Sequence, residues 1–368
     1  MKLHRNILAF ARRHWHVGAA ALLTAVAGCA RELHSSESAL APAGPQAQRI
    51  ATLTWMFMGV CAVVYVLVIL ALFGALLHRR KASLNLPNND PVEPDMQGEK
   101  RTWTTVLTCT GITVITLFVL LIADFSVGRA AYKFSTADPD PMHIQIIGHQ
   151  WWWEIHYTDW PDRFGERMAY NTFATANEFH IPVDPDHPVS VQLDIESHDV
   201  IHSFWVPNLS GKRDLIPGHG TSLWIRADHP GTYYGECAEY CGYQHANMRL
   251  VVVAEPVEKF RAWLDAQRTP PPEPTTEAQK RGRDVFMHTA CATCHTIGGT
   301  SARGLVGPNL THVGSRILIA GGALQNVPGN LGGWIIDPQR IKPGAVMPRI
   351  NLAPDDLRNL LEYVQSLK

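Results

Sequence analysis

The sequence lacks a surplus of either charge. Its 32 lysine and arginine residues nearly balance 33 aspartate and glutamate residues, so the formal net charge is −1. Proteins that bind nucleic acid through its phosphates carry a basic surplus, so we expect no nucleic-acid partner. No cysteine is left for a structural disulfide either, because each of the seven lies in a segment with another use. These segments are a processing site (Cys29), two apolar runs (Cys61, Cys109), one loop (Cys237, Cys241) and a Cys-x-x-Cys-His motif (Cys291, Cys294).

Charged residues are absent from two long stretches, Ala51–Leu77 and Trp103–Ala123. A bilayer-spanning helix needs about 20 apolar residues, so we expect a two-helix transmembrane hairpin over residues 50–124. Buried helices of a soluble domain are the alternative, but the runs are long for that use. The basic run His78–Lys81 follows the first stretch and marks the connecting loop as cytoplasmic. Both outer ends of the hairpin are therefore expected outside the membrane.

Residues 1–28 have the pattern of a signal peptide, with a basic start and a short apolar run from Val17 to Gly28. This run is too short to span a bilayer comfortably. It ends in Val-Ala-Gly-Cys, which resembles a bacterial lipobox and predicts lipidation of Cys29 after cleavage. The alternatives are ordinary cleavage or an uncleaved anchor with a plain cysteine, and an uncleaved anchor gives the hairpin the same orientation.

One loop follows the pattern Cys-x-Glu-x-Cys-x-x-x-His-x-x-Met from Cys237 to Met248. Thiolate, imidazole and thioether are ligands that copper selects. The two thiolates can bridge two copper ions, which then need one more histidine, and the carbonyl of Glu239 can complete the set. A disulfide between the two cysteines is an alternative in an exported segment. Zinc is another alternative, but it would leave Met248 without a role.

Short runs rich in β-branched and aromatic residues are separated by Gly, Pro and Asp, which predicts an all-β sandwich over residues 142–255. One strand is expected over Met142–Ile155, where alternation places Trp151 and Trp153 on one face and Trp152 on the other. Core packing is one role for these tryptophans. The other predicted strands are Glu178–Pro182, Val189–Ile195, Val200–Val206, Thr221–Ile225, Gly231–Tyr234 and Leu250–Val253.

The additional histidine has two candidates, His198 and His202. On a single strand they would point to the same face, because they are four residues apart. At roughly 3.3 Å per residue they would lie about 13 Å apart, which is too far to share one metal ion. Only one of them is therefore expected at the site.

Residues 256–276 are expected to form a short helix over Val257–Gln267 and a proline-rich linker. The linker is a semi-rigid spacer of about 20 Å, which can hold a second domain near the first without packing it there. That second domain, residues 277–368, carries the motif Cys-Ala-Thr-Cys-His at residues 291–295. This motif is typical of covalent c-type haem attachment. The alternatives are a redox dithiol or half of a zinc site, but no further cysteine pair exists to complete a zinc site.

The C-terminal domain resembles a small class I cytochrome c, which implies an all-α fold. In this resemblance Lys280–His288 is the first helix, Gly307–Leu310 is the turn beneath the histidine, and Ala353–Leu367 is the last helix. The haem is attached to Cys291 and Cys294, and its axial ligands are His295 and Met347. A rival methionine, Met287, lies only four residues before the first cysteine of the motif, on the wrong segment to cross the haem.

The loop from Cys237 to Met248 resembles the copper loop of cytochrome c oxidase subunit II, with every ligand position matched. Two other stretches resemble motifs of the same family: Gly148–Trp153 resembles Gly-His-Gln-Trp-Tyr-Trp, and Asp199–Ser203 matches Asp-Val-x-His-Ser. The resemblance implies a cupredoxin-like domain with a dinuclear copper centre, CuA. It implies electron uptake at Trp151. The implied CuA ligands are His202, Cys237, Glu239, Cys241, His245 and Met248.

The resemblance also assigns roles to residues around this centre. The carboxylate of Glu239 is expected to help bind Mg²⁺ at the interface with the catalytic subunit, and His198 is expected at the surface. Trp152 stands where the family has Tyr, and His219 stands where it has Arg. Glu99 lies near the position of a family carboxylate at the mouth of a proton channel.

We therefore expect a multidomain membrane protein with a two-helix transmembrane hairpin, an all-β cupredoxin-like CuA domain and an all-α cytochrome c domain. It is expected to pass electrons from haem c to CuA and on to subunit I of a haem-copper oxidase, which reduces oxygen and translocates protons. Other oxidase subunits are further partners, and the electron donor is a cytochrome c or a quinol–cytochrome c reductase complex. The expected location is the bacterial inner membrane, with both domains on the periplasmic side. The alternatives are the CuA subunit of a nitric oxide reductase and a membrane-tethered electron carrier.

Overall fold

The computed structural model describes residues 37–82, 96–135, 138, 141–159 and 173–368. The predicted signal peptide and the lipidation site at Cys29 lie outside the described residues. Helix α2 (Pro45–Ala82) and helix α3 (Met96–Ser135) contain the two predicted membrane spans. Each helix continues past its uncharged run into polar residues, so each is longer than the predicted 51–77 and 103–123. Residues Arg49–Phe134 form a structural unit of their own.

The side chains of α2 and α3 explain why these helices require a membrane. Large apolar side chains such as Leu67, Leu70 and Phe118 are more than half exposed along both helices. An apolar surface of this extent is unfavourable in water and is expected in contact with lipid. The two helices have the length and the apolar composition needed to cross a bilayer.

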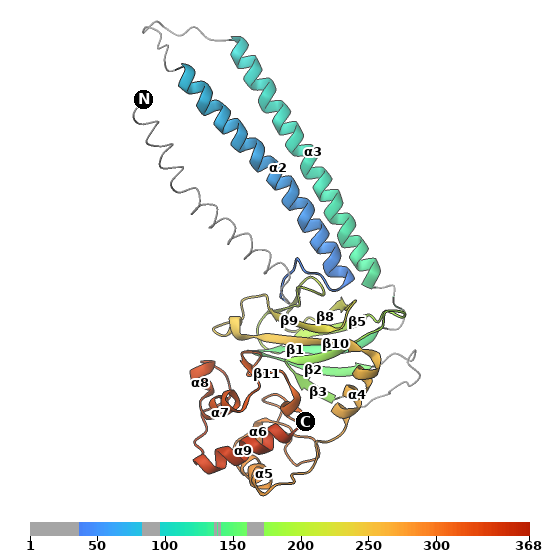
Figure 1. The fold of residues 1–368 in the computed structure, drawn as a ribbon, viewed down its shortest axis with the longest axis vertical. Helices are drawn as coiled ribbons and strands as arrows, with labels where there is room; N and C mark the ends of the chain where they lie inside the picture. Colours follow the sequence, from blue (N-terminus) through green and yellow to red (C-terminus); the bar gives the residue numbers. More distant parts are fainter. Residues whose placement is uncertain (1–36, 83–95, 136–137, 139–140, 160–172) are drawn as a thin grey trace, which may run out of the picture. The chain divides into compact units, whose positions relative to one another are not determined.

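The β domain consists of two five-stranded sheets (Figure 1). In the first sheet the strands occur in the order β3 (Phe173–Ala176), β2 (Trp152–Asp159), β1 (Met142–His149), β5 (Val191–Ser197) and β8 (Thr221–Ile225). In the second sheet the order is β4 (Glu178–Val183), β10 (Arg249–Pro256), β9 (Gly231–Cys237), β6 (His202–Trp205) and β7 (Arg213–Leu215). The pairs β1–β5 and β4–β10 are parallel, and the other neighbouring strands are antiparallel.

Alternating burial along the strands builds one core between the two sheets. In β1 and β5 every second side chain is buried, including Ile144, Ile146, Leu193 and Ile195. Phe204 of β6 joins them in the same cluster of buried apolar side chains. The sandwich predicted from strand-like runs and turn residues is therefore present, and the core places β6 and the end of β9 side by side.

Two local predictions about strands were wrong. Residues Met142–Ile155 do not form one strand, because the chain turns at Gln150–Trp151 and pairs His149 with Trp152. The turn is held by tertiary contacts: the backbone N–H of Gln150 donates to the Asp199 carboxylate at 2.7 Å. Both Trp151 and Trp153 are buried, while Trp152 is half-buried.

His198 and His202 do not share a strand either. Strand β5 ends at Ser197 and β6 begins at His202, with a bend between them. The bend is supported by local hydrogen bonds, including that from the N–H of Val200 to the carboxylate of Asp199 at 2.7 Å. Asp residues favour such turns over extended strands because they bind nearby backbone groups. The strand-based separation of about 13 Å therefore does not apply.

The C-terminal domain begins after α4 (Val257–Arg268) and the proline-rich segment. Its main helices are α5 (Glu277–His288), α6 (Cys291–Cys294), α7 (Pro328–Ile336), α8 (Pro338–Ile341) and α9 (Pro354–Ser366), with a short ladder of β11 (Leu318–Ile319) and β12 (Leu324–Gln325). Helices α5 and α9 cross closely at Gly282, where a Cβ atom would lie 2.0 Å from the carbonyl oxygen of Asn359. This glycine permits the crossing on which the helical core is built.

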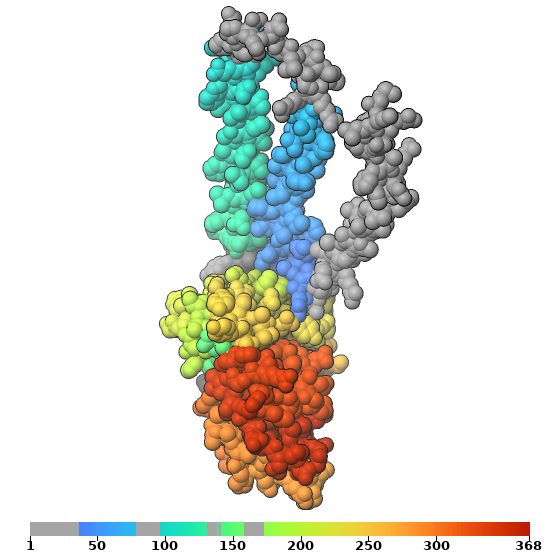
Figure 2. Space-filling view, turned by 90° about the vertical axis from the view of Figure 1, so that its left-hand side faces the viewer, coloured from blue at the N-terminus to red at the C-terminus, as the bar shows by residue number. Residues whose placement is uncertain are grey.

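The C-terminal domain packs directly against the β domain, in contrast to the expectation from the linker. The N–H of Ile317 donates to the carboxylate of Glu178 at 2.7 Å, and the N–H of Arg249 donates to the carbonyl of Gly321 at 2.9 Å. Figure 2 shows the C-terminal domain, in orange and red, in contact with strands drawn in green and yellow. The composition of the linker indicated its stiffness but contained no information about the surfaces on either side of it.

Candidate metal centres

Two cysteine thiols face each other where β9 leads into the loop before β10. The Sγ atoms of Cys237 and Cys241 are 3.7 Å apart, well beyond the length of about 2.05 Å of a disulfide bond. Both side chains are buried. The alternative of a disulfide is therefore not what the structure shows. At this separation a single metal ion can contact both sulfur atoms, since metal–thiolate bonds are about 2.3 Å long.

Imidazole, thioether and carbonyl donors surround the two thiols. Nδ1 of His202 lies 3.9 Å from Sγ of Cys237, and Nδ1 of His245 lies 3.7 Å from Sγ of Cys241. Sδ of Met248 lies 3.9 Å from Sγ of Cys241. The carbonyl oxygen of Glu239 lies 3.2 Å from Sγ of Cys237. The structure thus brings together all six predicted donors, and this soft donor set fits copper better than zinc or magnesium.

The two thiols are electrostatically coupled. The hydrogen bond from Cys241, assisted by that from His202, lowers the pKa of Cys237 to about 3, whereas the same contact raises the pKa of Cys241. The first proton of the pair is therefore lost more easily than that of an isolated thiol. Because the thiolate is the form that binds metals, a metal ion would replace the remaining proton.

His202 is oriented by contacts on both sides of its ring. Its Nε2 is 2.9 Å from the Asp199 carboxylate, which leaves Nδ1 facing Cys237. A carboxylate on the far nitrogen commonly orients a metal-binding imidazole. On β1, a Cβ atom on Gly148 would lie 2.8 Å from Cδ2 of His202, so the fully buried ring occupies the space that this glycine leaves open. Asp199 is the first residue of the matched Asp-Val-x-His-Ser motif, and its carboxylate supplies this contact.

The loop is also tied to the β1–β2 turn. Nε2 of Gln150 and Nε1 of Trp151 both donate to the carbonyl of Cys241, at 2.8 Å and 2.9 Å. The N–H of Cys237 donates to the carbonyl of Met248 at 2.9 Å and closes the base of the loop. Sequence reasoning missed Gln150, because a glutamine in a turn gives no signal of a distant carbonyl partner.

Other residues singled out in the sequence lie outside this donor cluster. His198 is exposed, and its ring is tilted against that of His149 with ring centroids 4.9 Å apart. The carboxylate of Glu239 accepts a hydrogen bond from the N–H of Tyr240 at 3.1 Å. His219 is exposed in the β7–β8 turn, and Glu99 lies exposed in the first turn of α3.

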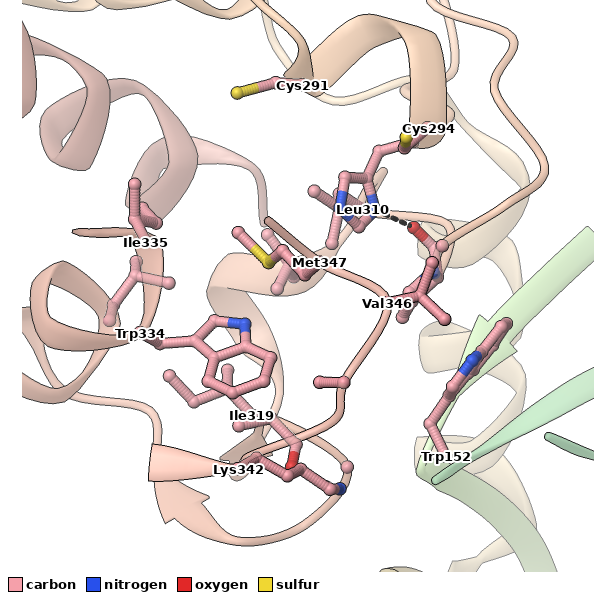
Figure 3. Close-up of a pocket in the computed structure, with 18 of the residues that line it drawn as sticks. Trp152, Cys291, Cys294, Leu310, Ile319, Trp334, Ile335, Lys342, Val346 and Met347 are labelled. Atoms are coloured by element: carbon pink, nitrogen blue, oxygen red, sulfur yellow. Dashed lines mark hydrogen bonds between the residues drawn. The ribbon is translucent and has the colours of Figure 1, made fainter. Parts of the chain in front are cut away.

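The C-terminal domain contains an apolar cavity that fits a covalently bound haem. Cys291 and Cys294 line the cavity together with His295 and Met347. Figure 3 shows the sulfur atoms of both cysteines and of Met347 around this space. The remaining lining is mainly apolar and includes Phe286, Leu310, Trp334, Ile335, Leu360 and Val364.

His295 would hold the haem iron through one of its ring nitrogens. Its Nδ1 lies 2.8 Å from the carbonyl oxygen of Pro308, which accepts the Nδ1 proton and leaves Nε2 free to bind iron. Burial lowers the pKa of His295 and favours the neutral, metal-binding form. A Cβ atom on Gly307 would lie 2.5 Å from Cε1 of His295. The turn at residues 307–310 therefore supports the ring, as the resemblance predicted.

Met347 is the methionine that lines the cavity, whereas Met287 packs beside the core of the domain. The loop that carries Met347 is held by Gln339, whose Nε2 donates to the carbonyl oxygens of Ala345 at 2.6 Å and Met347 at 2.9 Å. The arrangement therefore favours the histidine–methionine pair that the sequence indicated.

The haem cavity and the thiol cluster meet at Trp151. Trp151 and Trp152, both from the β domain, line the cavity of the C-terminal domain. Figure 3 shows Trp152 at the side of this cavity near Val346. The indole of Trp151 also donates to the carbonyl of Cys241. Trp151 therefore contacts both candidate centres.

Comparisons with known proteins agree with this arrangement of domains. Residues 142–255 match the family described as cytochrome C oxidase subunit II, periplasmic domain, and residues 279–368 match the family described as cytochrome c. The cytochrome c oxidase subunit 2 of Alkalihalophilus pseudofirmus is 35% identical over 353 residues, covering 93% of this chain and 93% of that protein. The protein of the same name from Bacillus sp. strain PS3 is 29% identical over 276 residues, covering 70% of this chain and 73% of that protein.

A crystal structure of the periplasmic domain of subunit II of cytochrome oxidase from Bradyrhizobium japonicum has 26% sequence identity and a TM-score of 0.30. The similar region covers 36% of this chain and 96% of the chain in that crystal structure. The two apolar helices and the external domain family indicate a membrane-anchored protein with external domains. Because the similarity to the Alkalihalophilus protein covers 93% of both chains, this chain belongs to the cytochrome c oxidase subunit II family, with a C-terminal cytochrome c domain and a role in electron transfer.

Proposed function

We propose that this chain passes electrons from its own haem c to its dinuclear copper centre and on to the catalytic subunit of a haem-copper oxidase. Bound haem c and CuA each supply a site that accepts and releases one electron, and the protein supplies their binding, orientation and surroundings. The role of this chain is therefore to hold two redox groups in one fixed arrangement. The reduction of oxygen and the translocation of protons belong to the catalytic subunit.

The position of Trp151 is the observation that supports this relay. Its side chain lines the haem cavity and donates to the carbonyl of Cys241, one of the proposed copper ligands. It is 7% exposed, so its indole is enclosed by the two domains and little of it faces solvent. Trp151 therefore provides a continuous protein contact between the two centres, and we assign it as the residue through which electrons reach copper.

The same geometry supports a proposal for the residues that would hold each group. Copper would be bound by the six donors described above, with Asp199 orienting His202. Haem would be attached through Cys291 and Cys294 and ligated by His295 and Met347. Histidine–methionine ligation raises the reduction potential of a haem, which suits a site that receives electrons from a respiratory donor.

We place further functions at the ends of this relay. The carboxylate of Glu239, beside the copper loop, is proposed to share a Mg²⁺ ion with the catalytic subunit. The donor is proposed to be a cytochrome c or a quinol–cytochrome c reductase complex. The chain is proposed to reside in the bacterial inner membrane as a lipoprotein modified at Cys29, with Glu99 of α3 near the mouth of a proton channel.

The relay is tested by reducing haem c with a light flash in the purified oxidase and following the absorbance of both centres. The proposal predicts that haem c is reoxidised as copper becomes reduced, before oxygen is consumed. Absence of transfer between the two centres would contradict the relay. The substrate is tested separately, since turnover of nitric oxide without turnover of oxygen would assign the complex to the nitric oxide reductases.

A further inference from the structure

The contact between the two domains contains a buried lysine. Lys342 belongs to the cytochrome c domain, directly after α8, and its side chain is almost fully buried. Its Nζ donates to three carbonyl oxygens: those of Trp151 at 2.6 Å, Asn247 at 2.8 Å and Ala320 at 3.0 Å. An ammonium group has three protons to donate, and each has an acceptor here.

The three acceptors come from three different segments. Trp151 lies in the β1–β2 turn that touches both centres. Asn247 lies in the copper loop, between the proposed ligands His245 and Met248. Ala320 lies in the β11–β12 turn of the cytochrome c domain. One cation therefore joins the haem domain, the copper loop and the tryptophan between them.

Glycines allow the surrounding loops to approach this cation. A Cβ atom on Gly321, which has φ +66°, would lie 2.3 Å from Nζ of Lys342 and 2.4 Å from the carbonyl oxygen of Trp151. A Cβ atom on Gly344 would lie 3.3 Å from Cη2 of Trp151. The adjacent Pro343 carbonyl accepts a hydrogen bond from Nε2 of Gln244 in the copper loop, at 2.9 Å.

Packing alone does not explain a charged residue at this position. Among the described residues, none of the ion pairs recorded includes Lys342. A buried charge is costly, and an apolar side chain of similar volume is often at least as stabilising. A lysine, unlike an apolar residue, fixes the relative positions of the three segments, because its donors are satisfied only when all three carbonyl groups are in place. Burial lowers the pKa of Lys342 to about 7, and the nearby Cys241 opposes this shift by favouring the protonated form.

We propose that Lys342 is a positioning residue for electron transfer: its ammonium group clamps the haem domain onto Trp151 and the copper loop. A separate cytochrome would have to dock by diffusion, whereas the clamp holds the haem domain in a fixed contact. Electron transfer from haem to copper is therefore not limited by the rate of association. This inference rests on the proposed relay. It adds that the contact depends on one side chain that binds neither metal.

The test compares the intact oxidase with Lys342→Met, which keeps an unbranched side chain only one heavy atom shorter but removes its donors. Lys280→Met is the matched control, because Lys280 lies exposed on α5 and pairs with Glu277. Hydrogen exchange at the amides of Arg249 and Ile317 reports whether the contact opens, since both donate across it. Loss of charge-assisted bonds should accelerate exchange at both amides by about tenfold or more.

Electron transfer gives the second readout. After flash reduction of haem c, transfer to copper should slow by about tenfold or more in Lys342→Met. The haem spectrum and the reduction potentials of both centres should stay as in the unmodified protein. Lys280→Met should change neither exchange nor transfer. Unchanged exchange and unchanged transfer in Lys342→Met would overturn the proposal.

A second variant covers the case in which Lys342→Met does not assemble. Gly321→Ala leaves the lysine in place and pushes the opposite turn away from it, so it should open the same contact. If both variants act through one clamp, the double variant should be no worse than the more affected single variant. Normal amide protection in Gly321→Ala would contradict the clamp. A failure of the unmodified oxidase to transfer electrons would instead contradict the relay, and amide exchange would still test the clamp.

Discussion

Replacing Gly148 with alanine tests whether the buried histidine beside it binds copper. The new Cβ atom would lie 2.8 Å from Cδ2 and 3.2 Å from Cγ of His202. Carbon atoms in contact are normally about 3.5–4.0 Å apart, so the ring must shift by roughly 1 Å. Metal–ligand distances tolerate only about 0.2 Å, so a shift of this size should break the bond to copper.

The substitution should lower the free energy of unfolding only modestly, although it should disrupt the binding of copper. Overpacking of a core typically costs about 1–3 kcal/mol, which a domain of this size can withstand. The Gly148→Ala oxidase should therefore retain its haem c while losing copper or showing an altered copper spectrum. Copper content per haem c and the electron paramagnetic resonance spectrum measure this directly.

Gly220→Ala is the matched control, because a Cβ atom there would meet no atom within 4 Å. It should retain both the copper content and the spectrum. If Gly148→Ala also retained two copper ions with an unaltered spectrum, His202 would not be a ligand in the manner described here.

Three further predictions address the copper site, the haem site and the stability of the β domain. Asp199→Asn removes the carboxylate that orients the histidine ligand, and copper affinity measured by chelator competition should fall by about 10- to 100-fold; an unchanged affinity would show that the carboxylate has no such role. Met347→Leu removes the thioether, and the haem c potential measured by redox titration should fall, whereas an unshifted potential would point to a different axial ligand. Burial opposes the charge on His180, but its contacts with Glu178 at 3.6 Å and Glu255 at 2.7 Å raise its pKa above 6.5. Its contribution to stability should therefore be complete below pH 6.5 and be lost as the pH rises through the raised pKa, so thermal unfolding should show this dependence in the unmodified chain and lose it in His180→Gln.

The copper loop could be predicted from the sequence because its donors are local. Four side chains and one carbonyl lie within the twelve residues from Cys237 to Met248, and the residue types alone indicate copper. The haem motif could also be predicted from the sequence, because its two cysteines and its histidine lie within five consecutive residues. His202 was different, since spacing left two candidates and the resemblance to the oxidase family chose between them. The structure then showed why the other histidine lies apart, through the bend after β5.

Other features could not be predicted because they depend on distant partners. The turn at Gln150 and Trp151 lies inside an apolar, aromatic run that reads as one strand, and side-chain contacts to Cys241 and Asp199 override that pattern. The buried position of Lys342 has no signal in the sequence, because a lysine before a Pro-Gly pair is typical of an exposed turn. Its role became visible only when three carbonyl groups from separate segments were found around it.

One chain is proposed to hold both a dinuclear copper centre and a covalent haem. The most direct test is to measure copper and haem in the purified oxidase subunit and to record its electron paramagnetic resonance spectrum. The structure predicts two copper ions and one covalent haem per chain, with one unpaired electron shared by both copper ions. One copper ion, or none with Cys237 and Cys241 joined in a disulfide, would contradict the account and leave only a membrane-tethered cytochrome c.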